Sequence, residues 1–199
     1  MPKIIKNVEK KIIDSAIQLF ENNSYEEVDM KAIAKGAGIA VGTLYNYYSD
    51  KRDLFMSAFK VSWNHTIEKL EKVKFIEGQE RQILKESVER LYTGIYSKRF
   101  MFHEMMISSP LELQNQLKKD LSLEDDEEQS SIIKRDLLIS LEHGLADLID
   151  KKLIKLEKGT EERFVGLIFM DIWGLVMAFP EERDKNIAFL NNCIDLIFY

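Results

Sequence analysis

Residues 30–51 read MKAIAKGAGIAVGTLYNYYSDK, a pattern that predicts a short helix, a turn and a second short helix. Ala34 is the fifth residue of this window, where two helices that cross at about 90–120° leave room only for a small side chain. Gly38 is the ninth residue, where the turn favours a positive φ and therefore glycine. These features fall in register within one window, so together they predict a helix-turn-helix.

The second helix of this window carries side chains that suit DNA. Tyr45, Asn46 and Tyr47 are expected to face outward, where rigid rings, hydroxyls and an amide can meet phosphates and base edges. Leu44 and Tyr48 are four residues apart and are expected to share the inner face. The alternative is that the glycines of the window only mark a loop in an ordinary helical bundle. That alternative leaves the cluster of outward tyrosines unexplained, so we expect DNA binding.

Polar residues predict where the neighbouring helices begin and end. Apolar residues recur at helical spacing from Val8 to Phe20, and this helix is expected to end at Asn22–Ser24, since Asn tolerates the left-handed conformation that closes helices. Asp29 is expected to cap the helix at Met30, and Asp50 to cap a long helix that runs to about residue 75. The N-terminal part is therefore predicted to be a small three-helix domain.

The first third of the chain resembles the TetR family of one-component transcriptional regulators. The residues that carry the resemblance are Ile12-Ile13-Asp14-Ser15-Ala16-Ile17-Gln18-Leu19-Phe20, Tyr25, Ile33-Ala34, Ala37-Gly38-Ile39, Gly42-Thr43-Leu44-Tyr45, Tyr47-Tyr48, Lys51 and Asp53-Leu54-Phe55. The remaining two thirds resemble the family only in length and in being helical. Two positions depart from the family pattern: Asp29 stands where members often have Ser or Thr, and Ala40 where they have a small polar residue.

The resemblance implies an all-α fold of about nine or ten helices. Residues 1–50 would form the helix-turn-helix DNA-binding domain, and residues 51–199 a helical effector-binding and dimerisation domain. It implies a repressor that binds a palindromic operator in double-stranded DNA as a homodimer and is released by a small-molecule effector. The DNA-contacting positions of the family fall on Lys31, Gly42, Thr43, Tyr45, Asn46, Tyr47 and Lys51.

Composition limits the possible classes of protein. The 199 residues are 45% hydrophobic, which supports a real core. The net charge is −6, but residues 1–60 carry +1 and the remainder −7, so the acidic excess lies away from the predicted DNA reader. Cys193 is the only cysteine and has no partner for an intrachain disulfide, and no signal peptide is recognised, so we expect a reducing cytoplasm.

The segment FVGLIFMDIWGLVMAF, residues 164–179, is apolar on almost every side. It is shorter than the roughly 20 residues that span a bilayer and it contains Asp171, so we do not expect a membrane segment. A helix of this kind must be covered all round. We expect residues 132–156 and 162–179 of two copies to form a four-helix dimer interface; a central helix within one chain remains the alternative.

Aromatic, methionine and polar residues in the second part suggest an effector pocket. Flat rings and adaptable thioethers suit an apolar or planar ligand. The candidates are Tyr92, Tyr96, Phe100, His103, Met106, Asp171 and Trp173. Side chains at helical spacing also build ordinary cores, so a structural role for each remains open.

No motif for catalysis is recognised. The sequence has no nucleotide-binding glycine loop, no nucleophile with an ordered histidine and acid, and no ligand spacing for a metal, so we expect no enzyme activity, no cofactor and no metal. One other class stays open, a helical dimeric interaction protein that no longer reads DNA.

Overall fold

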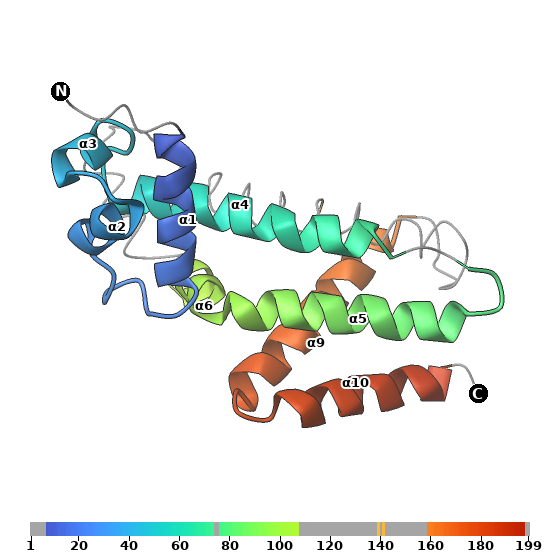
Figure 1. Ribbon diagram of the computed structural model, residues 1–199. Helices are drawn as coiled ribbons and strands as arrows, with labels where there is room; N and C mark the ends of the chain where they lie inside the picture. Colours follow the sequence, from blue (N-terminus) through green and yellow to red (C-terminus); the bar gives the residue numbers. More distant parts are fainter. Residues whose placement is uncertain (1–6, 74–75, 108–138, 140, 142–158, 198–199) are drawn as a thin grey trace. The chain divides into compact units, whose positions relative to one another are not determined.

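The computed structural model describes residues 7–73, 76–107, 139, 141 and 159–197. In these ranges the chain forms eight α-helices and no strand, which confirms the all-α prediction (Figure 1). They are α1 (Val8–Phe20), α2 (Met30–Ala37), α3 (Val41–Tyr45), α4 (Lys51–Glu71), α5 (Glu80–Ser97), α6 (Arg99–Ile107), α9 (Glu161–Ala178) and α10 (Arg183–Ile197).

The chain divides into two compact units. Unit 1 comprises Met1–Trp63 and Phe100–Ile107, and unit 2 comprises Asn64–Arg99 and Ser108–Tyr199. The boundary therefore falls within α4, a single helix of 21 residues. The functional division after residue 50 stays a prediction, because a boundary between compact units does not test which part binds DNA or effector.

Unit 1 is built around the apolar sides of α1, α2 and the first half of α4. Ile12, Ile33 and Leu54 are fully buried. Phe55 meets the ring of Phe20 edge to face, with centroids 5.0 Å apart, and meets Tyr25 in the same way at 5.2 Å. This aromatic cluster fixes the loop after α1 against the start of α4, and so supports the segment that leads into α2.

Helix ends in unit 1 are set by local hydrogen bonds. Asp50 accepts from the backbone N–H of Asp53 at 2.9 Å, as expected for the cap of α4, but α4 ends at Glu71, earlier than predicted. The prediction of a left-handed Asn after α1 is wrong. Instead the side-chain amides of Asn22 and Asn23 donate to carbonyl oxygens of the last turn of α1, at 2.7 and 2.8 Å.

Unit 2 contains the second half of α4 with α5, α9 and α10. Helices α5 and α10 run antiparallel, since Arg81 pairs with Asp195 at one end and Thr93 accepts from Arg183 at the other (Figure 1). Helix α9 packs against both. Its inner side is buried through Phe169, Ile172 and Val176. Within the described ranges, no helix combines the length and apolar character needed to cross a membrane.

The outer side of α9 is also apolar. Leu167, Met170 and Met177 are 59%, 50% and 43% exposed, and Gly174 lies between them on the same face. This helix therefore carries apolar residues on both sides, as the sequence predicts. The partner segment expected at residues 132–156 lies outside the described residues except for 139 and 141.

Candidate functional site

The turn between α2 and α3 is held by a left-handed glycine and backbone hydrogen bonds. Gly38 has φ 69° and ψ 35°, a conformation that costs glycine little and other residues more. The N–H of Ile39 donates to the carbonyl of Ala34 at 3.0 Å, and that of Gly38 to Lys35 at 3.1 Å. These bonds close α2 and start α3 in the expected place, confirming the predicted helix-turn-helix.

Helix α2 begins at the predicted cap and lies very close to α1. The Asp29 carboxylate accepts from the N–H of Ala32 at 2.6 Å. The hydroxyl of Ser15 donates to the carbonyl of Ile33 at 3.0 Å. A Cβ at Gly36 would collide with this same Ser15 side chain, so glycine here permits the close packing of the two helices.

Helix α3 and the turn that follows separate buried from exposed side chains as predicted. Leu44 is fully buried and Tyr48 is 7% exposed. Tyr45 and Tyr47 are 51% and 47% exposed, and Asn46 is exposed between them. The end of α3 and the turn after it therefore expose two aromatic rings with an amide side chain between them, and none of the three is part of the hydrophobic core.

The other predicted DNA contacts lie on the same unit but differ in accessibility. Lys31 on α2 and Gly42 on α3 are exposed, and Thr43 is half-buried. Lys51 is half-buried, and its ammonium group donates to the carbonyl oxygens of Tyr25 at 2.8 Å and Val28 at 3.0 Å. The contacts of all seven residues with DNA stay predictions.

Two tyrosines near this surface remain neutral phenols at neutral pH. Burial raises the pKa of Tyr48 above its usual value near 10, and nearby acids raise it further. Burial also raises the pKa of Tyr25, against an opposing effect of Arg52. The charge of this region therefore comes from its Lys, Arg, Asp and Glu side chains alone.

The seven candidate effector residues are divided between the two units. In unit 2, Tyr92 is fully buried, Tyr96 is half-buried, Trp173 is 8% exposed and Asp171 is exposed. The Tyr92 hydroxyl accepts a hydrogen bond at 3.0 Å from Asn186, which itself is 4% exposed. Tyr92 thus has a clear packing role, and its part in ligand binding stays a prediction.

The three candidates in unit 1 all lie on α6. Phe100 is half-buried and His103 is exposed. Met106 lies in the last turn of α6, where the structure describes the backbone only. Their role in binding an effector stays a prediction.

One hollow in unit 2 was not predicted from the sequence. It lies between the second half of α4 and α5, and its lining includes Thr66, Lys69, Gly94 and Lys98, none of which is among the seven candidates. The one sequence signal was Gly94, a small residue within an otherwise bulky helix. A glycine at that place permits a neighbouring helix to approach.

Comparisons with known proteins agree with this geometry. Residues 12–58 match the family model for bacterial regulatory proteins of the tetR family. These residues contain α1, α2, α3 and the start of α4. The fatty acid metabolism regulator protein of Bacillus subtilis is 32% identical over 102 residues. The helix-turn-helix region of the chain therefore matches the TetR family.

Two other transcriptional regulators resemble the chain over more of its length. The Staphylococcus aureus IcaR, a negative regulator of the biofilm operon icaADBC, is 25% identical over 175 residues, 86% of this chain and 85% of IcaR. The solved structure of FadR from Bacillus subtilis, in complex with stearoyl-CoA, has a TM-score of 0.58 at 23% identity, covering 94% of this chain and 95% of FadR. This likeness to FadR concerns the fold.

The curated match to the Bacillus subtilis regulator is confined to part of each protein. It covers 51% of this chain and 50% of that regulator's length. The likeness to the TetR family therefore lies mainly in the helix-turn-helix region. Within the described residues, no group of three or more His, Cys, Asp or Glu is placed to hold a metal ion.

Proposed function

We propose that this chain is a ligand-responsive transcriptional repressor that binds a palindromic DNA operator as a homodimer. The observation that carries the proposal is the outward placement of Tyr45, Asn46 and Tyr47 on a helix-turn-helix whose inner residues, Leu44 and Tyr48, are buried. Exposed aromatic and amide groups on a rigid scaffold suit base edges and phosphates in the major groove. Relatives named as regulators of fatty acid metabolism and of a biofilm operon support this function.

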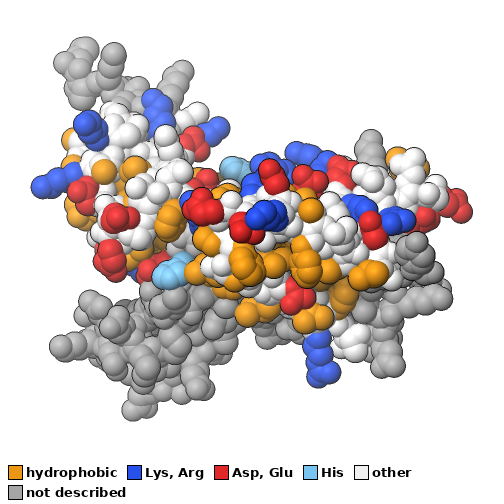
Figure 2. All heavy atoms as spheres, turned by 90° about the horizontal axis from the view of Figure 1, so that it is seen from below, with side chains coloured by type: hydrophobic (Ala, Val, Ile, Leu, Met, Phe, Trp, Pro, Cys, Tyr) orange, Lys and Arg blue, Asp and Glu red, His pale blue; other side chains and the backbone are white. Residues whose placement is uncertain are grey.

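Dimerisation is supported by the outer face of α9 and by its neighbour α10. Phe189 and Leu196 on α10 are 56% and 76% exposed, in addition to the exposed apolar residues of α9. Figure 2 shows hydrophobic side chains gathered in a band on one face of unit 2. Burial of such a band against a second copy removes apolar surface from water, which is the main driving force for association.

The effector is a small molecule, and a long-chain acyl-CoA is the first to test. FadR of Bacillus subtilis was solved with stearoyl-CoA, and the curated regulator from the same species carries a name that refers to fatty acid metabolism. Effector binding would lower the affinity for the operator, because a ligand shifts an equilibrium by its differential affinity for two states. Melting the protein with and without stearoyl-CoA checks this step apart from DNA binding.

We propose no enzymatic activity for the chain and place it in the cytoplasm, where operator DNA is found. The second candidate is a helical dimer that no longer reads DNA. One observation favours it: Asp29 uses its carboxylate to cap α2, so this position offers a phosphate no donor side chain. The exposed Tyr45 and Tyr47, with the exposed Asn46 between them, favour the repressor instead.

Substitution of the exposed tyrosines tests the proposed function. Tyr45→Ala and Tyr47→Ala each remove an exposed ring, so the fold and the dimer should persist. The affinity for the operator should fall at least tenfold, which corresponds to about 1.4 kcal/mol of binding free energy. Ile76→Ser is the matched control, since it removes an exposed apolar side chain between α4 and α5, outside the helix-turn-helix and the proposed dimer face, and it should leave operator affinity unchanged. Full affinity in both tyrosine variants would refute the assignment.

A further inference from the structure

Helix α6 is part of unit 1 although it lies far from the helix-turn-helix in the sequence. Phe102 on α6 is 1% exposed, and its ring meets those of Phe59 and Trp63 on α4 edge to face, with centroids 5.2 and 5.4 Å apart. Met101 beside it is fully buried. The unit that holds the helix-turn-helix therefore includes a helix from the middle of the chain.

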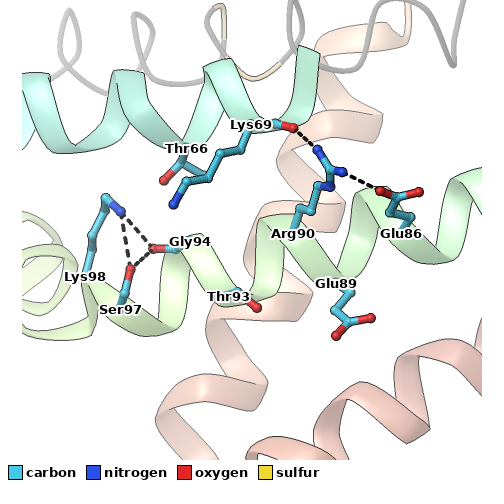
Figure 3. Close-up of a pocket in the computed structure, with 9 residues that line it drawn as sticks. All are labelled: Thr66, Lys69, Glu86, Glu89, Arg90, Thr93, Gly94, Ser97 and Lys98. Carbon is cyan, nitrogen blue, oxygen red and sulfur yellow. Dashed lines mark hydrogen bonds and ion pairs between the residues drawn. The ribbon is translucent and has the colours of Figure 1, made fainter. Parts of the chain in front are cut away.

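The start of α6 is determined by bonds at the end of α5. Lys98 is the single residue between the two helices, and its N–H donates to the carbonyl of Ile95 at 3.1 Å. Figure 3 shows the Ser97 hydroxyl and the Lys98 ammonium both directed at the carbonyl of Gly94, at 3.0 and 3.4 Å. These local bonds fix where α6 begins, so its position against α4 depends on the side chains further along it.

Glu104 joins α6 to the first turn of α4. One of its carboxylate oxygens lies 3.4 Å from the Arg52 guanidinium, and the side chains of Glu104 and Arg52 are 14% and 30% exposed. A charge pair that is mostly withdrawn from water is screened less than a pair on the surface. The guanidinium carbon also lies 5.9 Å from the centroid of the Phe55 ring. Arg52 is therefore held between α6 and the aromatic cluster of unit 1.

This pair lies beside the loop that leads into α2. Burial raises the pKa of Tyr25 in that loop, the Arg52 charge lowers it and the Glu104 charge raises it, so both charged groups lie near the Tyr25 phenol. Phe55 meets the same ring edge to face at 5.2 Å. Lys51, next to Arg52, donates to two carbonyl oxygens of the loop. The same turn of α4 therefore carries both the pair with α6 and the bonds that fix the loop.

We propose that Glu104 is a positioning residue for DNA binding, which holds the start of α4, and through it the loop before α2, by its pair with Arg52. A loop that is fixed before DNA arrives need not be ordered on binding, which favours affinity. Loss of the pair would leave the helix-turn-helix folded but less preorganised. This inference rests on the proposed function for its effect on DNA, whereas its effect on the loop is measured without DNA.

Glu104→Gln tests the proposal because it removes the charge but keeps the size of the side chain and an acceptor oxygen. Loss of a negative charge would by itself raise the affinity for DNA, whereas loss of the positioning pair should lower it by roughly threefold to tenfold. The probe is the duplex that the whole wild-type chain selects from random DNA, and fluorescence anisotropy measures its binding. Affinity in Glu104→Gln equal to or above that of the wild type would overturn the proposal.

Glu86→Gln is the matched control for the change of charge. It makes the same chemical change in unit 2, in an ion pair with Arg90 on α5. Because this pair lies outside unit 1 and outside the proposed dimer face, its loss should not weaken DNA binding. An equal loss of affinity in Glu86→Gln and Glu104→Gln would overturn the proposal, since it would show a general effect of charge.

A double-mutant cycle shows whether Glu104 acts through Arg52. Arg52→Gln should itself weaken binding, and the addition of Glu104→Gln should then cost less than about twofold more, because the pair is already broken. An equal loss from Glu104→Gln in both backgrounds would overturn the proposal, since Glu104 would then act by another route.

Amide hydrogen exchange of the loop provides a readout without DNA. In Glu104→Gln the amides of residues 25–29 should exchange faster, while those of α10 should be unchanged. Unchanged exchange in the loop would overturn the proposal even if DNA binding fell. If the wild type selects no DNA, the proposed function fails, and the exchange rates of the loop alone decide this inference.

Discussion

Lys51, the first residue of α4, binds Tyr25 in two ways: its ammonium donates to the Tyr25 carbonyl at 2.8 Å and lies 4.1 Å from the centroid of the Tyr25 ring. A further bond to the Val28 carbonyl at 3.0 Å fixes the loop that leads into α2. The sequence resemblance implies that Lys51 contacts DNA, and the structure gives its ammonium a role within unit 1. One of its three donor hydrogens remains for a phosphate.

Lys51→Met should therefore lower both stability and DNA affinity. It keeps most of the aliphatic stem but loses two hydrogen bonds to carbonyls and a cation–π contact, together about 1–3 kcal/mol. Urea unfolding measures the first effect and fluorescence anisotropy with operator DNA the second. Unchanged stability would show that the loop does not depend on this lysine.

Lys31→Ala should weaken DNA binding without affecting the fold. Lys31 is exposed on α2, so its loss should change stability by less than about 0.5 kcal/mol. If Lys31 contacts a phosphate, the slope of log affinity against log salt should fall by about 0.9 per site lost. Lys60→Ala, an exposed lysine on α4, serves as the control for general charge. An unchanged slope in Lys31→Ala would remove Lys31 from the contact set.

Alanine at Gly38 and at Gly42, two of the three glycines of the helix-turn-helix, should have different effects on stability. Gly38 has a positive φ, so Gly38→Ala should destabilise unit 1 by about 1 kcal/mol or more. A Cβ at Gly42 meets open space, so Gly42→Ala should fold normally and lose operator affinity only if DNA approaches this backbone closely. Circular dichroism melting and DNA binding of the two variants distinguish the cases. Equal stability for both would contradict the role given to Gly38.

Tyr92→Phe should weaken unit 2 whether or not Tyr92 touches an effector. The hydroxyl accepts from Asn186, which is buried and also donates to the carbonyl of Phe179 at 3.0 Å. Loss of this acceptor should cost about 1 kcal/mol, measured by denaturant unfolding. The companion variant Asn186→Ala should cost more, because it removes several bonds and leaves the Phe179 carbonyl without this donor. Equal or smaller loss in Asn186→Ala would refute this network.

Asp195 should make unit 2 sensitive to acid. Hydrogen bonds from Arg81 and Lys85 on α5 lower its pKa to about 2, from the ordinary value of 3.8. Since the folded pKa is the lower one, the stabilisation is complete above about pH 4 and is lost as the pH falls toward 2. Asp195→Asn should therefore flatten the fall in stability between pH 5 and 2. An identical acid profile in the variant would show that the pair contributes nothing.

The helix-turn-helix was predictable because its signals are local. The cap at Asp29, the left-handed Gly38 and the spacing of Leu44 from Tyr48 act within a few residues of one another. Each restricts the backbone or one face of a helix, whatever the rest of the chain does. The exposed side chains of α3 follow directly, since the inner positions determine the outer ones.

The role of Lys51 and the hollow between α4 and α5 depend on contacts that are distant in sequence. Lys51 bonds to residues 23 and 26 positions away, and Thr66 meets Gly94 on another helix. Helical spacing alone cannot pair such positions. The same limit applies to Tyr92, because a buried tyrosine with a hydrogen bond and a tyrosine in a ligand pocket have the same periodicity.

Selection of random duplex DNA by the purified protein, at two salt concentrations, tests the central claim most directly. A dimeric reader should enrich a palindrome whose half-site centres lie about 10–10.5 base pairs apart or a multiple of this, and enrichment should fall at higher salt. Tyr47→Ala, run in parallel, should lose the palindrome. No enriched sequence from protein shown to be folded and dimeric, with and without stearoyl-CoA, would contradict the account and favour a helical dimer that does not read DNA.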